Sequence, residues 1–305
     1  MSFILHSFPF IPAGPSSFIL FLASLIIGII LGILIAYLAY RAKALNRSGA
    51  VAAAVLGAVI FGLGGVPWAI LLLTFFISSS ALSRAFSRRK KGLDEKYSKG
   101  SQRDAGQVLA NGGIAGLLVL FFIILRYLSP ESPFLTWVWL AFAASLAAAN
   151  ADTWATELGV LNPTAPRLIS NGRRVEPGTS GAISLVGSLA ALAGAALIAL
   201  AAWLMTAAHW GPAALTPSDW LPFLWVIIAG MAGSLVDSLL GATLQTIYFC
   251  PTCKKETERH PLHTCGTPTQ FTHGLTRLDN DWVNTACTAA AMLVVLFAGW
   301  VTLSW

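Results

Sequence analysis

The chain has 305 residues, of which 56% are hydrophobic and only 10% are charged, and its mean hydropathy is +0.72. Soluble domains are far less apolar, so this composition excludes a soluble enzyme or binding module. The formal net charge is +6, from 19 Lys and Arg against 13 Asp and Glu. We expect residues 1–305 to form a single integral membrane domain of the all-α class, a polytopic bundle of transmembrane helices.

Apolar runs of the length that crosses a bilayer, about 20 residues, recur along the chain. The second run is short and interrupted by glycine, and the third, which follows Pro67, is also brief. Counting both, we expect eight spans. In chain order they are residues 17–40, 50–61, 69–82, 108–128, 135–161, 182–208, 220–248 and 284–305.

Lys and Arg fall in alternate connections between these runs. Of the 19, 18 lie within residues 41–47, 84–103, 167–174 and 254–277, and Arg126 is the exception. Short loops near membrane ends carry Lys and Arg on the cytoplasmic side. We therefore expect a multi-pass protein with both termini outside the cytoplasm, and we place it in the plasma membrane of a prokaryote. The run from Arg88 to Lys91 exceeds what orientation requires and is typical of a solvated face or a lipid-headgroup contact.

The fifth expected helix carries an unusual polar segment near its cytoplasmic end: Asn150, Asp152, Thr153, Thr156 and Glu157. An ionisable group in the bilayer interior costs about 2.5–3.5 kcal/mol on insertion scales, so such groups usually face a water-filled cavity or a ligand. Two acids little more than one helical turn apart indicate a site for a cation or a phosphate–metal complex. The alternative is that they form ion pairs with arginines from neighbouring loops.

Three other helices carry polar strips at the same end. At 100° per residue, each strip occupies one side of its helix, so the four faces are expected to surround one cavity open to the cytoplasm. The small and polar residues of the seventh helix are also compatible with helix packing, and acids at helix starts are also compatible with capping. The strips are Asp104, Gln107 and Asn111; Ser234, Asp237 and Ser238; and Asp281 and Asn284.

The loop before the sixth helix resembles an anion cradle. Arg173 and Arg174 offer forked donors for phosphate, and the residues from Glu176 to Gly181, including Gly178, Thr179 and Ser180, let backbone N–H groups approach a ligand at a helix start. It is not a Walker A motif. An ordinary topology-determining loop with a Ser or Thr helix cap is the competing interpretation.

Residues 249–279 form a cytoplasmic Cys/His loop between the last two expected helices. A Cys-x2-Cys pair, Cys250 and Cys253, is followed by His260, His263 and Cys265, which are ligand types suited to tetrahedral zinc. A disulfide is disfavoured on the cytoplasmic side. We predict a closed structural zinc site made by the three cysteines and one histidine, with His263 favoured over His260. The alternative is a loop of unligated thiols.

Five ordered segments carry a resemblance to a known family: 103–113, 150–159, 176–181, 233–243 and 280–284. They resemble the integral membrane family known as domain of unknown function 92, related to transmembrane protein 19. The resemblance runs from about residue 31 to the C-terminus. That family includes the plant phytyl-phosphate kinase of tocopherol synthesis, so the resemblance implies phosphoryl transfer from a nucleoside triphosphate to an isoprenyl monophosphate. The Cys/His loop is not general to the family, which implies that it is not catalytic.

The resemblance and the polar faces lead to one hypothesis, an isoprenyl-monophosphate kinase that uses Mg²⁺ and CTP or ATP. Phosphoryl transfer needs positioning and charge neutralisation. We expect Asp152, Glu157 and Asp237 to hold Mg²⁺. Asn150, Arg173 and Arg174 complete the expected catalytic set, and Arg84 or Arg103 is expected to hold phosphate. The other expected substrate and nucleotide contacts are Asp104, Gln107, Asn111, Glu176, Gly178, Thr179, Ser180, Gly181, Ser234, Ser238, Asp281 and Asn284.

Two other functions use the same ingredients. Intramembrane acids also serve ion-coupled transporters, here of lipid phosphate or metal, although the outer halves of the helices are nearly uncharged. A CTP-dependent lipid nucleotidyl transferase is the third reading, and it would release pyrophosphate. The expected partners are an isoprenyl monophosphate, a nucleoside triphosphate and membrane lipids, with no nucleic acid.

Overall fold

The computed structural model describes residues 15–86, 102–208, 210, 215 and 218–304. Within them, eight helical segments are long and apolar enough to cross a membrane, which confirms the expected span count. The N-terminal residues before Pro15 and the basic run from Arg88 to Lys91 lie outside the described residues. The helices are α1 (Pro15–Arg41), α2 (Arg47–Val59), α3 (Val66–Phe86), α4 (Ala105–Leu128), α5 (Phe134–Gly159), α6 (Leu185–Ala207), α7 (Leu221–Thr243) and α8 (Asn280–Ser304).

The short second span is completed by a π-helical turn. Asn46 caps α2 by accepting a hydrogen bond from the Gly49 N–H at 2.9 Å, and η1 (Ile60–Gly64) continues the helix at its other end. Together they form an 18-residue span, Arg47–Gly64. The glycines that made this run look interrupted therefore lie within a continuous helical segment.

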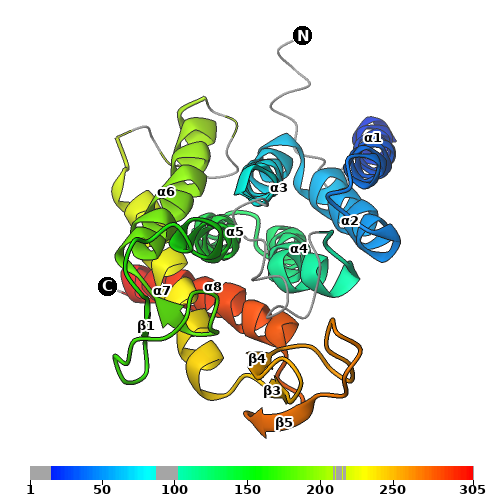
Figure 1. The fold of residues 1–305 in the computed structure, drawn as a ribbon. Helices are drawn as coiled ribbons and strands as arrows, with labels where there is room; N and C mark the ends of the chain where they lie inside the picture. Colours follow the sequence, from blue (N-terminus) through cyan, green and yellow to red (C-terminus); the bar gives the residue numbers. More distant parts are fainter. Residues whose placement is uncertain (1–14, 87–101, 209, 211–214, 216–217, 305) are drawn as a thin grey trace.

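Helix α5 forms the centre of the bundle. In Figure 1 it lies among α3, α4, α6, α7 and α8, and 89% of its most apolar window is buried, against 17% for α1. Alanines from Ala141 to Ala149 occupy much of this buried length, and small residues let membrane helices pack closely. The polar segment that follows on α5 is consequently held inside the bundle.

Two small sheets lie in the connections, which the all-α prediction did not include. In one sheet, β1 (Arg167–Leu168) pairs in antiparallel orientation with β2 (Ala182–Ile183). The other has the order β4-β3-β5, with β3 (Ile247–Cys250) between β4 (Lys255–Thr257) and β5 (Gln270–His273).

These strands correct two expected helix boundaries. Ala182 lies in β2, and α6 begins at Leu185 after Ser184, whose hydroxyl accepts a hydrogen bond from the Gly187 N–H at 3.1 Å. Tyr248 lies in β3, because α7 ends at Thr243. Apolar β-strands adjoin apolar helices at both places, so hydropathy alone did not separate them.

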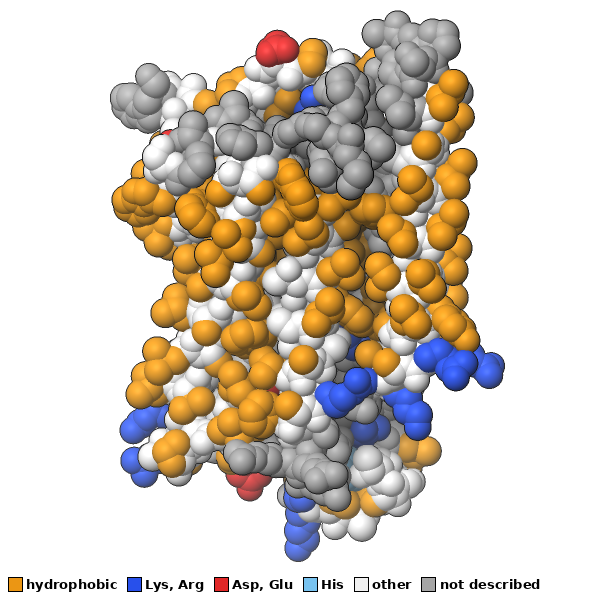
Figure 2. Space-filling model, turned by 90° about the horizontal axis from the view of Figure 1, so that it is seen from above, with side chains coloured by type: hydrophobic (Ala, Val, Ile, Leu, Met, Phe, Trp, Pro, Cys, Tyr) orange, Lys and Arg blue, Asp and Glu red, His pale blue; other side chains and the backbone are white. Residues whose placement is uncertain are grey.

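Lys and Arg side chains gather near one end of the molecule, below a broad belt of hydrophobic side chains (Figure 2). At this end α1, α3, α5 and α7 finish and α2, α4, α6 and α8 begin. We call it the basic end. Its side chains come from the alternate connections that the sequence singled out.

Candidate active site

A polar cavity of about 430 Å³ opens at the basic end of the bundle. The last turns of α5 and α7 and the first turns of α4, α6 and α8 surround it, and the segment 177–184 covers one side. It therefore brings together the four helix faces that the sequence predicted. The predicted residues that line it are Arg103, Gln107, Asn111, Asp152, Thr153, Thr156, Glu157, Gly178, Thr179, Ser180, Gly181, Ser234, Asp237, Ser238 and Asn284.

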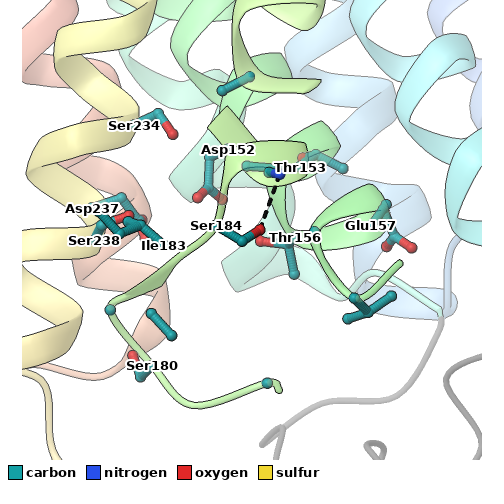
Figure 3. Close-up of a pocket in the computed structure, with 18 of the residues that line it drawn as sticks. Asp152, Thr153, Thr156, Glu157, Ser180, Ile183, Ser184, Ser234, Asp237 and Ser238 are labelled. Atoms are coloured by element: carbon teal, nitrogen blue, oxygen red, sulfur yellow. Dashed lines mark hydrogen bonds between the residues drawn. The ribbon is translucent and has the colours of Figure 1, made fainter. Parts of the chain in front are cut away.

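Asp152 and Asp237 face each other across this cavity. They reach from α5 and α7 toward the same space (Figure 3), and the carboxyl groups are close enough for each to act electrostatically on the other. The Oδ2 atom of Asp237 is buried and has no hydrogen-bond partner among the described residues. Two carboxylates this close repel each other unless a proton or a cation lies between them. Oxygen ligands of this kind suit Mg²⁺.

Glu157 lies apart from that pair. It is farther along α5 (Figure 3), where its Oε1 accepts a hydrogen bond from the Ser83 hydroxyl at 2.8 Å. Its charge acts on Arg103. Among the described residues, no group of three or more acidic side chains has its oxygens within 4.8 Å of one another. The structure thus brings two of the three predicted Mg²⁺ ligands together and places the third beside Ser83, where its charge acts on Arg103.

Arg103 is held at the cavity wall by both its backbone and its side chain. Its N–H donates to the Ala44 carbonyl and its carbonyl accepts from the Asn46 N–H, each at 3.0 Å. The guanidinium donates to the Ser79 hydroxyl at 2.9 Å and lies 5.5 Å from the centre of the Phe75 ring. Withdrawal from water lowers the pKa of Arg103 to about 10, and the nearby Glu157 charge opposes that shift. Arg103 is therefore a cation at neutral pH, fixed where it can meet an anionic ligand.

The segment Gly178–Gly181 lies directly against the end of α7. Gly181 has φ +73°, and a Cβ there would stand 2.3 Å from the Ala242 nitrogen, so neither the backbone conformation nor the space admits a side chain. The Ser180 hydroxyl donates to Gln245 Oε1 at 2.7 Å. The segment is thereby fixed beside α7, but β2 and the Ser184 cap separate it from α6, so it does not lie at a helix start as the sequence predicted.

Glu258 joins the same network and was not predicted. Gln245 donates from Nε2 to Glu258 Oε1 at 2.8 Å, Glu258 lines the cavity, and its charge acts on Asp237. It follows β4 in the Cys/His loop. The sequence feature that could have drawn attention to Glu258 is its position between the paired cysteines and His263.

A row of serines on α3 was also missed. Ser78 donates to Asn150 Oδ1 at 3.0 Å, and Ser79 and Ser83 contact Arg103 and Glu157 as described above. Each of these serines thus positions a residue that the sequence did single out. The signal was present as a cluster of hydroxyls, Ser78 to Ser83, within an otherwise apolar helix.

Arg173 and Arg174 do not line the acidic cavity. They are exposed and line a neighbouring cavity of about 720 Å³ with Glu176, Lys254 and Lys255. The two cavities share Pro177, Gly178, Thr179, Ser180 and Glu258. The arginine pair and the acids therefore stand on opposite sides of the glycine-containing segment.

Four further predicted residues lie outside the acidic cavity. Asn150 is fully buried, and its amide donates to the Gly194 carbonyl at 2.9 Å, so it ties α5 to α6 and, through Ser78, to α3. Asp104 caps α4 in a capping box with Gln107. Arg84 donates to the Ala42 carbonyl, and Asp281 lies in the first turn of α8. We assign Asn150 and Asp104 to helix packing and capping.

The Cys/His loop brings Cys250, Cys253, His263 and Cys265 together, with their ligand atoms within 4.8 Å of one another. The Sγ atoms of Cys250 and Cys265 are 3.6 Å apart, and His263 Nδ1 is 3.4 Å from Cys265 Sγ. A tetrahedral zinc with standard bond lengths would space such atoms by about 3.8 and 3.6 Å. His260 instead stacks on Tyr248, with ring centres 4.4 Å apart. The arrangement fits the predicted ligand set.

The thiols of this cluster differ in their acidity. Hydrogen bonds with Thr267 and then His263 lower the pKa of Cys265 to about 6. Contact with the other two thiols, Cys265 first, raises the pKa of Cys253 to about 11. A cation bound by these sulfurs would stabilise their thiolate forms.

Comparison with known proteins places the chain among membrane proteins. It is 35% identical over 269 residues to Protein PGR of Arabidopsis thaliana, covering 85% of this chain and 91% of that protein. It is 32% identical over 226 residues to an uncharacterized membrane protein of Methanocaldococcus jannaschii, covering 73% and 84%. No solved structure matches. The family model described as integral membrane protein DUF92 matches residues 30–292, and the chain belongs to that family.

Proposed function

We propose that this protein is a membrane-embedded isoprenyl-monophosphate kinase, which transfers a phosphoryl group from a nucleoside triphosphate to a phytyl- or geranylgeranyl-phosphate-like lipid. The observation that carries the proposal is the Asp152–Asp237 pair, set in a polar cavity at the basic end of an apolar bundle. Membrane position gives access to a lipid, and the paired carboxylates suit the metal that phosphoryl transfer needs.

The reaction forms one bond and breaks one. A lipid phosphate oxygen attacks the γ-phosphorus of the nucleotide, the bond from that phosphorus to the bridging oxygen breaks, and a nucleoside diphosphate leaves. Asp152 and Asp237 would hold Mg²⁺, which would supply neutralisation of the phosphate charge. The attacking oxygen is already ionised, so no strong base is required, and no histidine lines the cavity within the part of the chain described.

Different arginine side chains would bind the two phosphate-bearing substrates. Arg103, fixed inside the bundle, would hold the lipid phosphate. Arg173 and Arg174, in the neighbouring cavity, would hold the nucleotide, CTP or ATP. Residues 177–180 line both cavities, so the γ-phosphate would pass from one substrate to the other beside this segment.

The basic end is proposed to face the cytoplasm, with both termini on the other side of a prokaryotic plasma membrane. The positive-inside rule supports this orientation, and the nucleotide is available on that side. A cysteine introduced at exposed Asn171 should react with a membrane-impermeant maleimide from the cytoplasmic face, and one at exposed Ser218 from the outer face. The wild-type chain supplies the background of its four native cysteines. Reversed labelling would contradict the orientation.

The deciding experiment uses purified protein in lipid nanodiscs with Mg²⁺, each of the four nucleoside triphosphates, and phytyl, geranylgeranyl and farnesyl monophosphates. A kinase yields the lipid diphosphate and a nucleoside diphosphate. A nucleotidyl transferase yields a nucleotide-linked lipid and pyrophosphate. A transporter changes none of the masses but moves ligand across sealed vesicles. Absence of lipid diphosphate with every combination would overturn the kinase proposal.

A further inference from the structure

A second, apolar cavity adjoins the active-site cavity. It has a volume of about 140 Å³ and lies among α1, α2, η1, α3 and α4, which occupy one side of the bundle in Figure 1. We call it the apolar slot. Its walls include Leu31, Ile35, Ala53, Leu56, Phe61 and Leu72.

The slot and the polar cavity meet at three residues of the α4 start. Arg103, Gln107 and Asn111 line both. The amide of Asn111 donates to the Gln107 carbonyl at 2.9 Å, and Gln107 belongs to the capping box of α4. Arg103 is therefore the charged group at the junction, with a carboxylate-lined cavity on one side and an apolar wall on the other.

This junction selects for one kind of ligand. A molecule that lies across it must present an anion to Arg103 and an apolar chain to the slot within a few bonds of each other. A dry cavity of about 150 Å³ holds one benzene molecule, so a slot of about 140 Å³ accommodates about one five-carbon isoprene unit. It has no room beside Arg103 for the two chains of a glycerolipid phosphate.

We propose that the apolar slot binds the first isoprene unit of the lipid monophosphate while its phosphate lies on Arg103, and that the rest of the chain runs out into the bilayer. The proposal rests on the proposed function for the identity of the lipid. It adds the residues that recognise the tail and a limit on chain selectivity. Units beyond the first contact membrane lipid, so geranylgeranyl and farnesyl monophosphates bind with similar affinity from the bilayer.

The first test fills the slot. Ala53→Phe places a ring in the slot, and Val55→Phe is the matched control on the same helix, where Val55 is 62% exposed and does not line the slot. Without nucleotide present, binding of geranylgeranyl monophosphate to protein in nanodiscs should weaken at least tenfold for Ala53→Phe. It should stay within about twofold for Val55→Phe. Equal affinity of Ala53→Phe and wild type would overturn the proposal.

The second test uses the wild-type chain, so it does not depend on how a variant folds. A geranyl monophosphate with a photoreactive diazirine next to its first isoprene unit is irradiated with the protein, and the labelled peptides are identified. Labelling of α1–α3 residues that line the slot, competed by geranylgeranyl monophosphate, is the expected result. Labelling confined to other helices would overturn the proposal.

These readouts separate the slot from the kinase assignment. If no nucleotide yields a lipid diphosphate but binding and labelling follow the slot, the kinase proposal fails and the slot stands. If the diphosphate forms and Ala53→Phe neither weakens binding nor raises KM for the lipid, the slot fails and the kinase proposal stands.

Discussion

Two clusters of side chains that could hold a metal ion lie at the same end of this protein, and they differ in ligand type and in how closely they would surround an ion. Asp152 and Asp237 offer hard oxygen ligands from two helices, in a cavity large enough to hold phosphates. The Cys/His cluster offers four soft or borderline ligands from one loop, close enough together to surround an ion. A metal ion with a free coordination position can take part in a reaction, whereas an ion whose positions are all filled by protein ligands stabilises the fold.

Because of this difference, the loss of each cluster is expected to have a different consequence. The acid pair contributes little to folding, since its like charges repel. The Cys/His cluster shapes the loop from which Glu258 reaches the active-site cavity. Removing the acids should therefore abolish chemistry without unfolding, whereas removing the zinc ligands should destabilise a region and disturb chemistry only through Glu258.

The largest effect is expected from Asp152→Asn or Asp237→Asn. Each change removes charge with almost no change in volume, so kcat/KM should fall at least about 1,000-fold, equivalent to roughly 4 kcal/mol of lost transition-state stabilisation. Asp281→Asn is the matched control, because this acid lies at the same end but does not line the cavity. Turnover at saturating Mg²⁺ and thermal unfolding are measured in parallel. Near-normal turnover of either variant would remove that residue from the metal site.

The next effect concerns zinc. Protein purified without chelators should contain about one zinc atom per chain, and the double variant Cys250→Ser, Cys253→Ser should contain none. Structural zinc contributes folding free energy locally, so the melting temperature should fall more clearly than the turnover rate. Cys287→Ser is the control, since this buried thiol lies in α8 and outside the cluster. Elemental analysis that finds no zinc in the wild-type protein would contradict the assignment.

Glu258 connects the two clusters, and its substitution should have an intermediate effect. Glu258→Gln keeps a partner for Gln245 but removes a negative charge that acts on Asp237. We expect Mg²⁺ affinity and kcat/KM to fall about tenfold, which corresponds to about 1.4 kcal/mol, with zinc content unchanged. Glu131→Gln, in the α4–α5 connection at the opposite end of the bundle, is the control. If removal of zinc lowers activity as much in Glu258→Gln as in wild type, Glu258 is not the connection.

The sequence was sufficient for the features that depend on composition along one helix. Hydropathy predicts the eight spans, and helical periodicity predicts that Asp152, Ser234 and Asp237 share a cavity. The ligand spacing of Cys250 and Cys253 predicts the Cys/His cluster, whose ligand atoms do converge. Each of these follows from residues that are neighbours in the chain or on one helix face.

The remaining features depend on how elements pack in three dimensions. Glu258 enters the cavity because β4 pairs with β3, which no local pattern reveals. Glu157 faces Arg103 rather than the acid pair because Ser83 on another helix holds it there. Arg84 and Arg103 were alternatives for a phosphate contact in addition to Arg173 and Arg174, and only the packing of the α4 start shows that Arg103 lines the acidic cavity and Arg84 does not. The hydrogen bonds of Asn150 could not be predicted from α5 alone, because its partners, Ser78 and the Gly194 carbonyl, lie on other helices.

The smallest effect is expected from the exposed arginines of the neighbouring cavity. Arg173→Gln and Arg174→Gln each remove one solvent-screened contact to a nucleotide phosphate, and exposed ion pairs contribute about 0.2–1 kcal/mol. KM for the nucleoside triphosphate should rise about two- to fivefold, while kcat and KM for the lipid stay unchanged, because the contact is made equally in the ground and transition states. Raising the salt concentration should reduce the difference in nucleotide KM between wild type and variant.

Arg126→Gln, on α4 at the opposite end of the bundle, is the control for loss of one positive charge. A large fall in kcat with unchanged KM would instead place Arg173 or Arg174 at the transferring phosphate, and would mean that the 177–184 segment moves to bring the two cavities together.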